Sequence, residues 1–104
     1  MFGKNSLPKT ARVPFQELNT LLPVVRRVHG EAHPELADVE RLFTTLRERL
    51  EAGASADEAY RLMNQIRGLT KDYTVPADAC PAFQKTYAAL SKLDDSLRAA
   101  CTGQ

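Results

Sequence analysis

Two histidines and two cysteines are the residues best suited to bind a metal or to act as nucleophiles. His29 and His33 are four residues apart, a spacing that would place both imidazoles on one face of a helix. Gly30 and Pro34 interrupt this stretch, so one continuous helix across both histidines is not expected. We therefore favour a hydrogen bond of His29 at a helix end, and a position of His33 near the cap of the next helix, over a metal-binding pair.

The cysteines give a weak chemical signal. Cys80 and Cys101 lack the spacing of a zinc motif and do not form a disulfide framework, so free thiols are expected. Cys80 precedes Pro81 at an expected helix start, where a helix dipole can favour a thiolate. No histidine, aspartate or lysine can be assigned to Cys80 from the sequence, so a small capping residue is favoured over a catalytic thiol. Cys101 is interpreted as a small apolar residue in a last helical turn.

Other motifs that carry chemistry are missing from the sequence. A di-iron site in a helical bundle needs several inward glutamates and histidines, often as Glu-x-x-His, and the sequence has no such motif. It also has no glycine-rich phosphate loop. With 14 basic and 13 acidic residues, the net charge of +1 does not predict nucleic acid or an anionic membrane as a partner. The residues alone therefore predict no active site.

Hydrophobic spacing predicts four helices, over residues 15–29, 34–52, 55–69 and 81–100. Pro23 is expected to kink or divide the first helix near Leu22, because proline removes a helical hydrogen bond. Ser55 and Glu58 form a capping box at the start of the third helix. Asp94 lies at the edge of the apolar face of the fourth helix, where it is expected to meet water or an arginine.

The predicted fold is an all-α, antiparallel up-down-up-down four-helix bundle, because short connections favour antiparallel neighbours. The chain has 104 residues, which favours one domain. Residues 14–104 are assigned to the bundle and residues 1–13 to a flexible, basic N-terminal tail. No apolar run approaches the roughly 18 residues of a membrane span, and residues 1–13 lack the apolar segment of a secretory signal. A cytoplasmic location is therefore expected.

Two stretches of the sequence resemble a known family. Residues 22–36, which include Val28-His29-Gly30, resemble the first helix and following turn of hemerythrin-like iron–sulfur cluster repair proteins. Residues 66–81 resemble the connection between the third and fourth helices of these proteins, and residues 87–97 continue the match. The most specific part of the resemblance is the loop that contains Tyr73, Thr74, Pro76, Ala79 and Cys80.

The resemblance implies a hemerythrin-like bundle that acts where nitric oxide or oxidants damage iron–sulfur clusters. Members of the family are di-iron proteins, whose iron is held by several histidines and two bridging glutamates. His29 is the single metal ligand that carries over, because the expected later histidines correspond to Ala56 and fall near Ala100. One histidine cannot hold two irons, so we predict a divergent or truncated relative that has lost the metal site.

The favoured function is a non-enzymatic helper or interaction module of the nitrosative or oxidative stress response. It requires a protein partner and no cofactor, and it predicts exposed apolar residues outside the core. Leu7, Val13 and Phe15 are candidates for such a surface, although they could equally cover the end of the bundle. The sequence predicts neither the identity of the partner nor the oligomeric state.

Two other hypotheses stay open. In the first, iron is bound in cluster repair by His29 together with Glu31, His33 or Asp94, or by a site shared between two chains. In the second, the chain is a structural remnant, or a small sensor that acts through one of its two cysteines.

Overall fold

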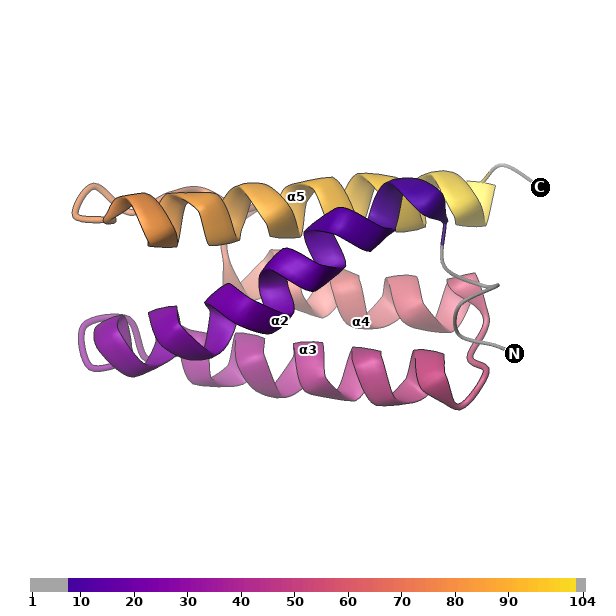
Figure 1. The fold of residues 1–104 in the computed structure, drawn as a ribbon, viewed down its shortest axis with the longest axis horizontal. Coiled ribbons are helices and arrows are strands. Elements are labelled where there is room, and N and C mark those ends of the chain that lie inside the picture. The colour runs from indigo at the N-terminus through magenta and orange to yellow at the C-terminus, as the bar shows by residue number, and fades with distance from the viewer. Residues whose placement is uncertain (1–7, 103–104) are drawn as a thin grey trace.

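The computed structural model describes residues 8–102, which form four α-helices and no strand (Figure 1). The helices are α2 (Lys9–His29), α3 (Glu35–Glu51), α4 (Ala56–Leu69) and α5 (Pro81–Thr102). The α2–α3 and α4–α5 connections lie at one end of the molecule, and the α3–α4 connection lies at the other (Figure 1). The prediction of an all-α, four-helix arrangement is confirmed.

The core lies where the apolar faces of the four helices meet. α2 packs mainly against α5, and α3 packs mainly against α4. Burying each large aliphatic side chain contributes about 1.5–3 kcal/mol to folding, so the apolar faces of the four helices hold the bundle together. The fully buried side chains include Leu18 and Leu22 of α2, Leu36 and Leu46 of α3, Met63 and Ile66 of α4, and Phe83, Leu90 and Leu93 of α5.

The first helix begins earlier than predicted. α2 starts at Lys9 instead of Phe15, so residues 9–13, which the sequence assigned to a tail, are helical. Ala11 is completely buried, and Ser96 Oγ of α5 donates a 2.8 Å hydrogen bond to Thr10 Oγ1. These long-range contacts hold the first turn of α2 on the bundle, and local sequence does not reveal them. Residues 1–7, including the candidate Leu7, lie outside the described residues.

Two prolines lie inside α2 without dividing it. The helix runs through both Pro14 and Pro23, so of the two predicted outcomes, a kink or a division near Leu22, the division is wrong and the kink stays a prediction. A proline inside a helix costs about 3 kcal/mol, because it lacks the N–H group and clashes with the preceding turn. Leu18, Leu22 and other side chains on the inner face of α2 are fully buried, and this packing offsets the cost.

The junction between α3 and α4 follows the predicted capping signal. Ser55 is the N-cap of α4, and its side chain accepts a 3.2 Å hydrogen bond from the Glu58 N–H group. The Glu58 carboxylate accepts a 2.6 Å hydrogen bond from Arg49 Nε, which ties the end of α3 to the start of α4. Gly53 supplies the turn with a φ of 95°, a conformation that side chains with a Cβ atom disfavour.

None of the helices in the described part of the chain combines the length and the apolar character needed to cross a membrane.

Candidate functional site at one end of the bundle

A thiol and an imidazole meet at the end of the molecule that carries two of the connections. His29 Nε2 lies 3.2 Å from Cys80 Sγ, and both residues are half-buried. His29 is the last residue of α2, and Cys80 immediately precedes α5. The Cys80 carbonyl accepts a 3.0 Å hydrogen bond from the Gln84 N–H group, as expected of a helix N-cap. In such an arrangement, an imidazole can accept a thiol proton and a helix N-terminus can stabilise a thiolate.

Sequence reasoning missed this pair. It considered His29 as a metal ligand and assigned no histidine to Cys80, because the two residues are far apart in the chain. The pairing depends on how α2 ends beside the start of α5, which hydrophobic spacing does not define. Both residues lie in the two stretches that carry the family resemblance, and this was the one available signal.

One buried ring holds both histidines in place. The Phe83 ring is completely buried in the first turn of α5, and its centroid lies 5.2 Å from the His29 ring and 5.2 Å from the His33 ring. Tyr87, one turn further along α5, packs against Phe83 at 5.0 Å. The imidazoles are therefore fixed by aromatic packing as well as by polar contacts.

His33 links the start of α3 to the α4–α5 connection. Its Nε2 atom lies 3.1 Å from Asp78 Oδ1, and its Nδ1 atom lies 3.4 Å from Glu35 Oε2. His29 thus has a polar partner at a helix end and His33 lies near the start of α3, as the favoured interpretation predicted, whereas the two carboxylate partners of His33 were not predicted. A histidine with both ring nitrogens beside carboxylates is well oriented, because each contact restrains the ring.

The donor atoms of the described residues do not fit an iron site within one chain. Among residues 8–102, no three His, Cys, Asp or Glu side chains converge as a metal would require. Asp94 lies about 16 Å further along α5 than Phe83, so it does not reach His29. His29 as one metal ligand, including a ligand in a site shared between chains, stays a prediction.

Asp94 instead forms the centre of a buried polar network. It is only 2% exposed, so the prediction of a peripheral carboxylate is wrong, although the expected arginine contact is present. The Tyr73 hydroxyl donates a 2.6 Å hydrogen bond to Asp94 Oδ2, and Arg67 Nε and Arg98 Nη1 each lie 3.8 Å from the carboxylate. Burial and the hydrogen bond to Asp94 raise the pKa of Tyr73 far above its usual value.

The segment that delivers Tyr73 has an unusual backbone. Lys71, Asp72 and Tyr73 have φ values of 53°, 62° and 62°, which form a left-handed turn directly after α4. This conformation costs about 1–2 kcal/mol per residue when a Cβ atom is present. Thr70 Oγ1 accepts a 3.0 Å hydrogen bond from the Tyr73 N–H group and donates a 3.2 Å hydrogen bond to the Arg67 carbonyl. Thr70 and Asp94 therefore hold the turn from both sides.

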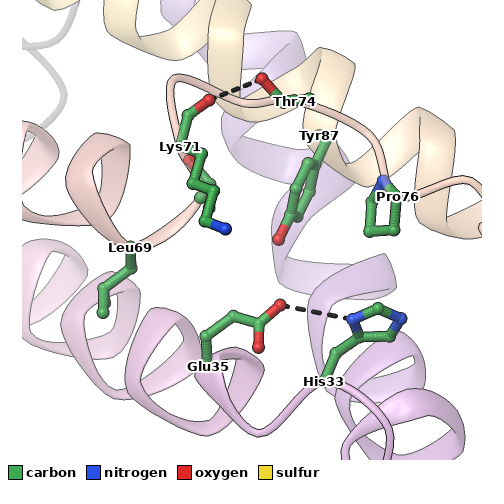
Figure 2. A pocket seen from close by; sticks show the side chains of 8 residues that line it. His33, Glu35, Leu69, Lys71, Thr74, Pro76 and Tyr87 are labelled. Carbon is green, nitrogen blue, oxygen red and sulfur yellow. Dashed lines mark hydrogen bonds and ion pairs between the residues drawn. The ribbon is translucent and has the colours of Figure 1, made fainter.

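A cavity of about 530 Å³ lies beside this turn (Figure 2). Tyr87 is 2% exposed, and its hydroxyl points into the cavity (Figure 2). Burial and the nearby Glu35 carboxylate raise the pKa of Tyr87 to about 12, so the phenol is protonated at neutral pH. The cavity is lined by His33, Glu35, Leu69, Thr70, Lys71, Thr74, Pro76 and Tyr87.

Cys101 lies far from this end of the molecule. It is separated from Cys80 by the length of α5, about 30 Å, and both cysteines are free. Its thiol contacts the Ala56 carbonyl at 3.2 Å. Burial and the neighbouring Asp57 raise the pKa of the Cys101 thiol, which disfavours its thiolate form.

The predicted surface candidates differ in exposure. Val13 is exposed, whereas Phe15 is half-buried and packs on Phe43 with ring centroids 5.0 Å apart. Phe15 therefore covers the core. Val24 and Val28 of α2 are also exposed, and sequence reasoning did not select them.

The described residues define an all-α protein of four helices that carries a thiol–imidazole pair at one end. Comparisons with family models, with curated proteins and with solved structures find no match for the chain.

Proposed function

We propose that this chain is a non-enzymatic interaction module that acts in the cytoplasm during nitrosative or oxidative stress. In this proposal it is a divergent hemerythrin-like protein with an antiparallel up-down-up-down bundle. Its partner is a protein that contains iron and takes part in the repair of iron–sulfur clusters. The family resemblance of residues 22–36, 66–81 and 87–97 supports this assignment.

The observation that carries the proposal is a set of three exposed valines on one face of α2. Val13, Val24 and Val28 are 63%, 39% and 65% exposed. At 100° per residue they fall within about 60° of one another around the helix, so they lie on one face. Val24 and Val28 are one turn apart and form an exposed apolar pair, whereas Val13 lies about 16 Å away along the helix. Neighbouring exposed apolar side chains of this kind can contribute to a protein contact surface. The opposite face of α2 supplies the buried leucines of the core.

The contacts of His29 also support a role without a resident di-iron centre. The one residue that matches a family metal ligand lies against the Cys80 thiol. A site with so few converging donors would hold iron weakly, because transition-metal affinity requires several ligands in fixed geometry. In this proposal, iron chemistry belongs to the partner.

The α2 surface can be tested by capture of partners from cells treated with nitric oxide. The intact chain is expected to retain a di-iron or iron–sulfur protein, and the variant Val24→Glu/Val28→Glu is expected to lose it. Val75→Glu is the matched control, because Val75 is an exposed valine outside α2. If the double variant retains the same protein, or if the intact chain retains no such protein, the proposal is wrong.

Iron analysis tests the iron-binding alternative on the same preparation. We expect substoichiometric iron and no change in thermal stability when ferrous ion is added under anaerobic conditions. A ligand that binds only the native state raises its stability, so one bound iron per chain or per dimer would be visible as a higher Tm. That result would favour a retained metal site.

A thiol sensor is a second candidate function, and the contact between His29 and Cys80 favours it. In the reaction that this geometry allows, His29 Nε2 accepts the Cys80 proton and the thiolate attacks one sulfur of oxidised glutathione. A mixed disulfide forms at Cys80, and one glutathione thiolate leaves. The two electrons of the new S–S bond balance those of the bond that breaks.

The sensor can be tested in a Cys101→Ser background, in which Cys80 is the remaining thiol. We expect Cys80 to form the mixed disulfide about tenfold faster than Cys101 does in a Cys80→Ser background. Adding His29→Gln is expected to remove most of the difference. Equal rates for the two thiols, or a rate unaffected by His29→Gln, would rule out a role for this pair.

A further inference from the structure

We infer that the cavity between the start of α3, the left-handed turn and α5 binds a small zwitterion, namely a free α-amino acid with an apolar side chain. Three polar groups from different elements face this space, and apolar walls surround them (Figure 2). The site is separate from the valine surface of α2 and from the Cys80 thiol.

The Tyr87 hydroxyl is the first observation. The side chain is 2% exposed, and its hydroxyl is directed into the cavity (Figure 2). Its ring packs on Phe83, but the hydroxyl forms no hydrogen bond with any residue between 8 and 102. The hydroxyl opens onto the cavity and is not enclosed in the core, so it can donate a hydrogen bond to a ligand there.

The charged side chains around Tyr87 define which charged groups the ligand carries. Glu35 and Lys71 line the same space from α3 and from the left-handed turn, and the Glu35 carboxylate also lies 3.4 Å from His33 Nδ1 (Figure 2). A purely anionic ligand would meet the Glu35 carboxylate, and a purely cationic ligand would meet the Lys71 ammonium. A zwitterion satisfies both groups. Its ammonium pairs with Glu35, and its carboxylate pairs with Lys71 and accepts a hydrogen bond from Tyr87.

The rest of the cavity suits an apolar side chain. Leu69 and Pro76 form walls on either side of the polar groups (Figure 2). Small-molecule sites commonly have volumes of about 300–1,000 Å³ and combine apolar walls with a few directed polar groups. The volume of about 530 Å³ accommodates an amino acid with a large side chain.

The strained turn gives Lys71 a fixed place. Lys71 is the first of the three left-handed residues, and its carbonyl accepts a 2.6 Å hydrogen bond from Thr74 Oγ1. The turn is anchored through Tyr73 and Asp94 on α5. Backbone strain of this kind persists where surrounding contacts determine the conformation, often at binding sites.

L-Phenylalanine is a suitable probe, followed by NMR titration of the whole chain. We expect saturable chemical-shift changes confined to residues 33–35, 69–76 and 87. The comparison ligands 3-phenylpropionate, which lacks the ammonium, and 2-phenylethylamine, which lacks the carboxylate, are each expected to bind at least about tenfold more weakly. No saturable change with phenylalanine, or equal binding of either comparison ligand, would overturn the inference.

Three variants locate the site. Tyr87→Phe keeps the ring that packs on Phe83 and removes only the hydroxyl, so we expect about fivefold weaker binding with the fold retained. Lys71→Gln and Glu35→Gln are each expected to weaken binding about tenfold. Lys92→Gln, an exposed lysine of α5 that does not line the cavity, is the control. Unchanged affinity in all three site variants would contradict the inference.

Discussion

The hydroxyl of Tyr73 donates a 2.6 Å hydrogen bond to the buried carboxylate of Asp94. This contact joins the left-handed turn after α4 to the middle of α5. It is the main interaction that satisfies Asp94, since Oδ1 of the same carboxylate has no hydrogen-bond partner among the described residues and only the distant ion pair with Arg98. The stability of the turn and that of the buried charge are therefore coupled.

The Tyr73→Phe variant should be less stable by about 1–3 kcal/mol, because it leaves a buried carboxylate without its hydrogen bond. For a domain of this size, each kcal/mol lowers the Tm by roughly 4–8 °C. A double-mutant cycle with Asp94→Asn measures the coupling directly. We expect the two changes to be less than additive, and strict additivity would show that the hydrogen bond does not link the turn to α5.

Two tyrosines should make the fold sensitive to alkaline pH. The pKa of Tyr87 is raised from 10.0 to about 12, and that of Tyr73 is also raised. The unfolded state therefore binds fewer protons than the folded state above pH 10. Stability should be fully present below pH 10 and should fall as the pH rises towards about 12, by at most about 3 kcal/mol for Tyr87.

This dependence can be measured by urea denaturation between pH 8 and pH 11.5. The Tyr87→Phe variant should lose less stability over that range than the unmodified chain does. A variant that follows the same pH dependence as the unmodified chain would show that the Tyr87 phenol does not contribute.

Two glycines should respond to alanine in opposite directions. Gly53 has a φ of 95°, so Gly53→Ala should destabilise the chain by about 1 kcal/mol although no atom lies within 4 Å of the new Cβ. Gly68 lies inside α4 with open space around its Cβ position, so Gly68→Ala should stabilise the chain by about 0.5–1 kcal/mol. Thermal denaturation of both variants checks these two predictions. Shifts of the Tm in the same direction for both variants would be inconsistent with these backbone conformations.

Removing an internal proline should stabilise α2. Pro23→Ala restores a backbone donor in the second-to-last turn of α2, and alanine favours a helix. We expect a gain of about 1–2 kcal/mol in the free energy of unfolding, reduced by the greater freedom of the unfolded chain. Loss of stability in Pro23→Ala would mean that the packing of the half-buried proline ring outweighs its backbone cost.

The positions of the helices were predictable because each has a regular apolar stripe and clear end signals. Ser55 capping α4 is an example, since the interaction is local in sequence. The early start of α2 was not predictable, because it depends on Thr10 meeting Ser96. The continuity of α2 through Pro23 likewise reflects packing that overrides local preference.

The candidate site was harder to predict than the helices. His29 and Cys80 each stood out by residue type, but their contact depends on where α2 ends relative to α5. The burial of Asp94 followed from the unusual turn at residues 71–73, for which the sequence contains no glycine signal. Hydrophobic spacing defines which face of a helix is buried, and it does not define how loops bring side chains together.

The valine surface of α2 can be tested most directly by placing a photo-reactive residue at position 28, with position 75 as the control. After irradiation of cells treated with nitric oxide, the account predicts a covalent adduct at position 28 with an iron-containing repair protein and none at position 75. Adducts of equal yield at both positions, or adducts at position 28 that contain only this chain, would contradict it.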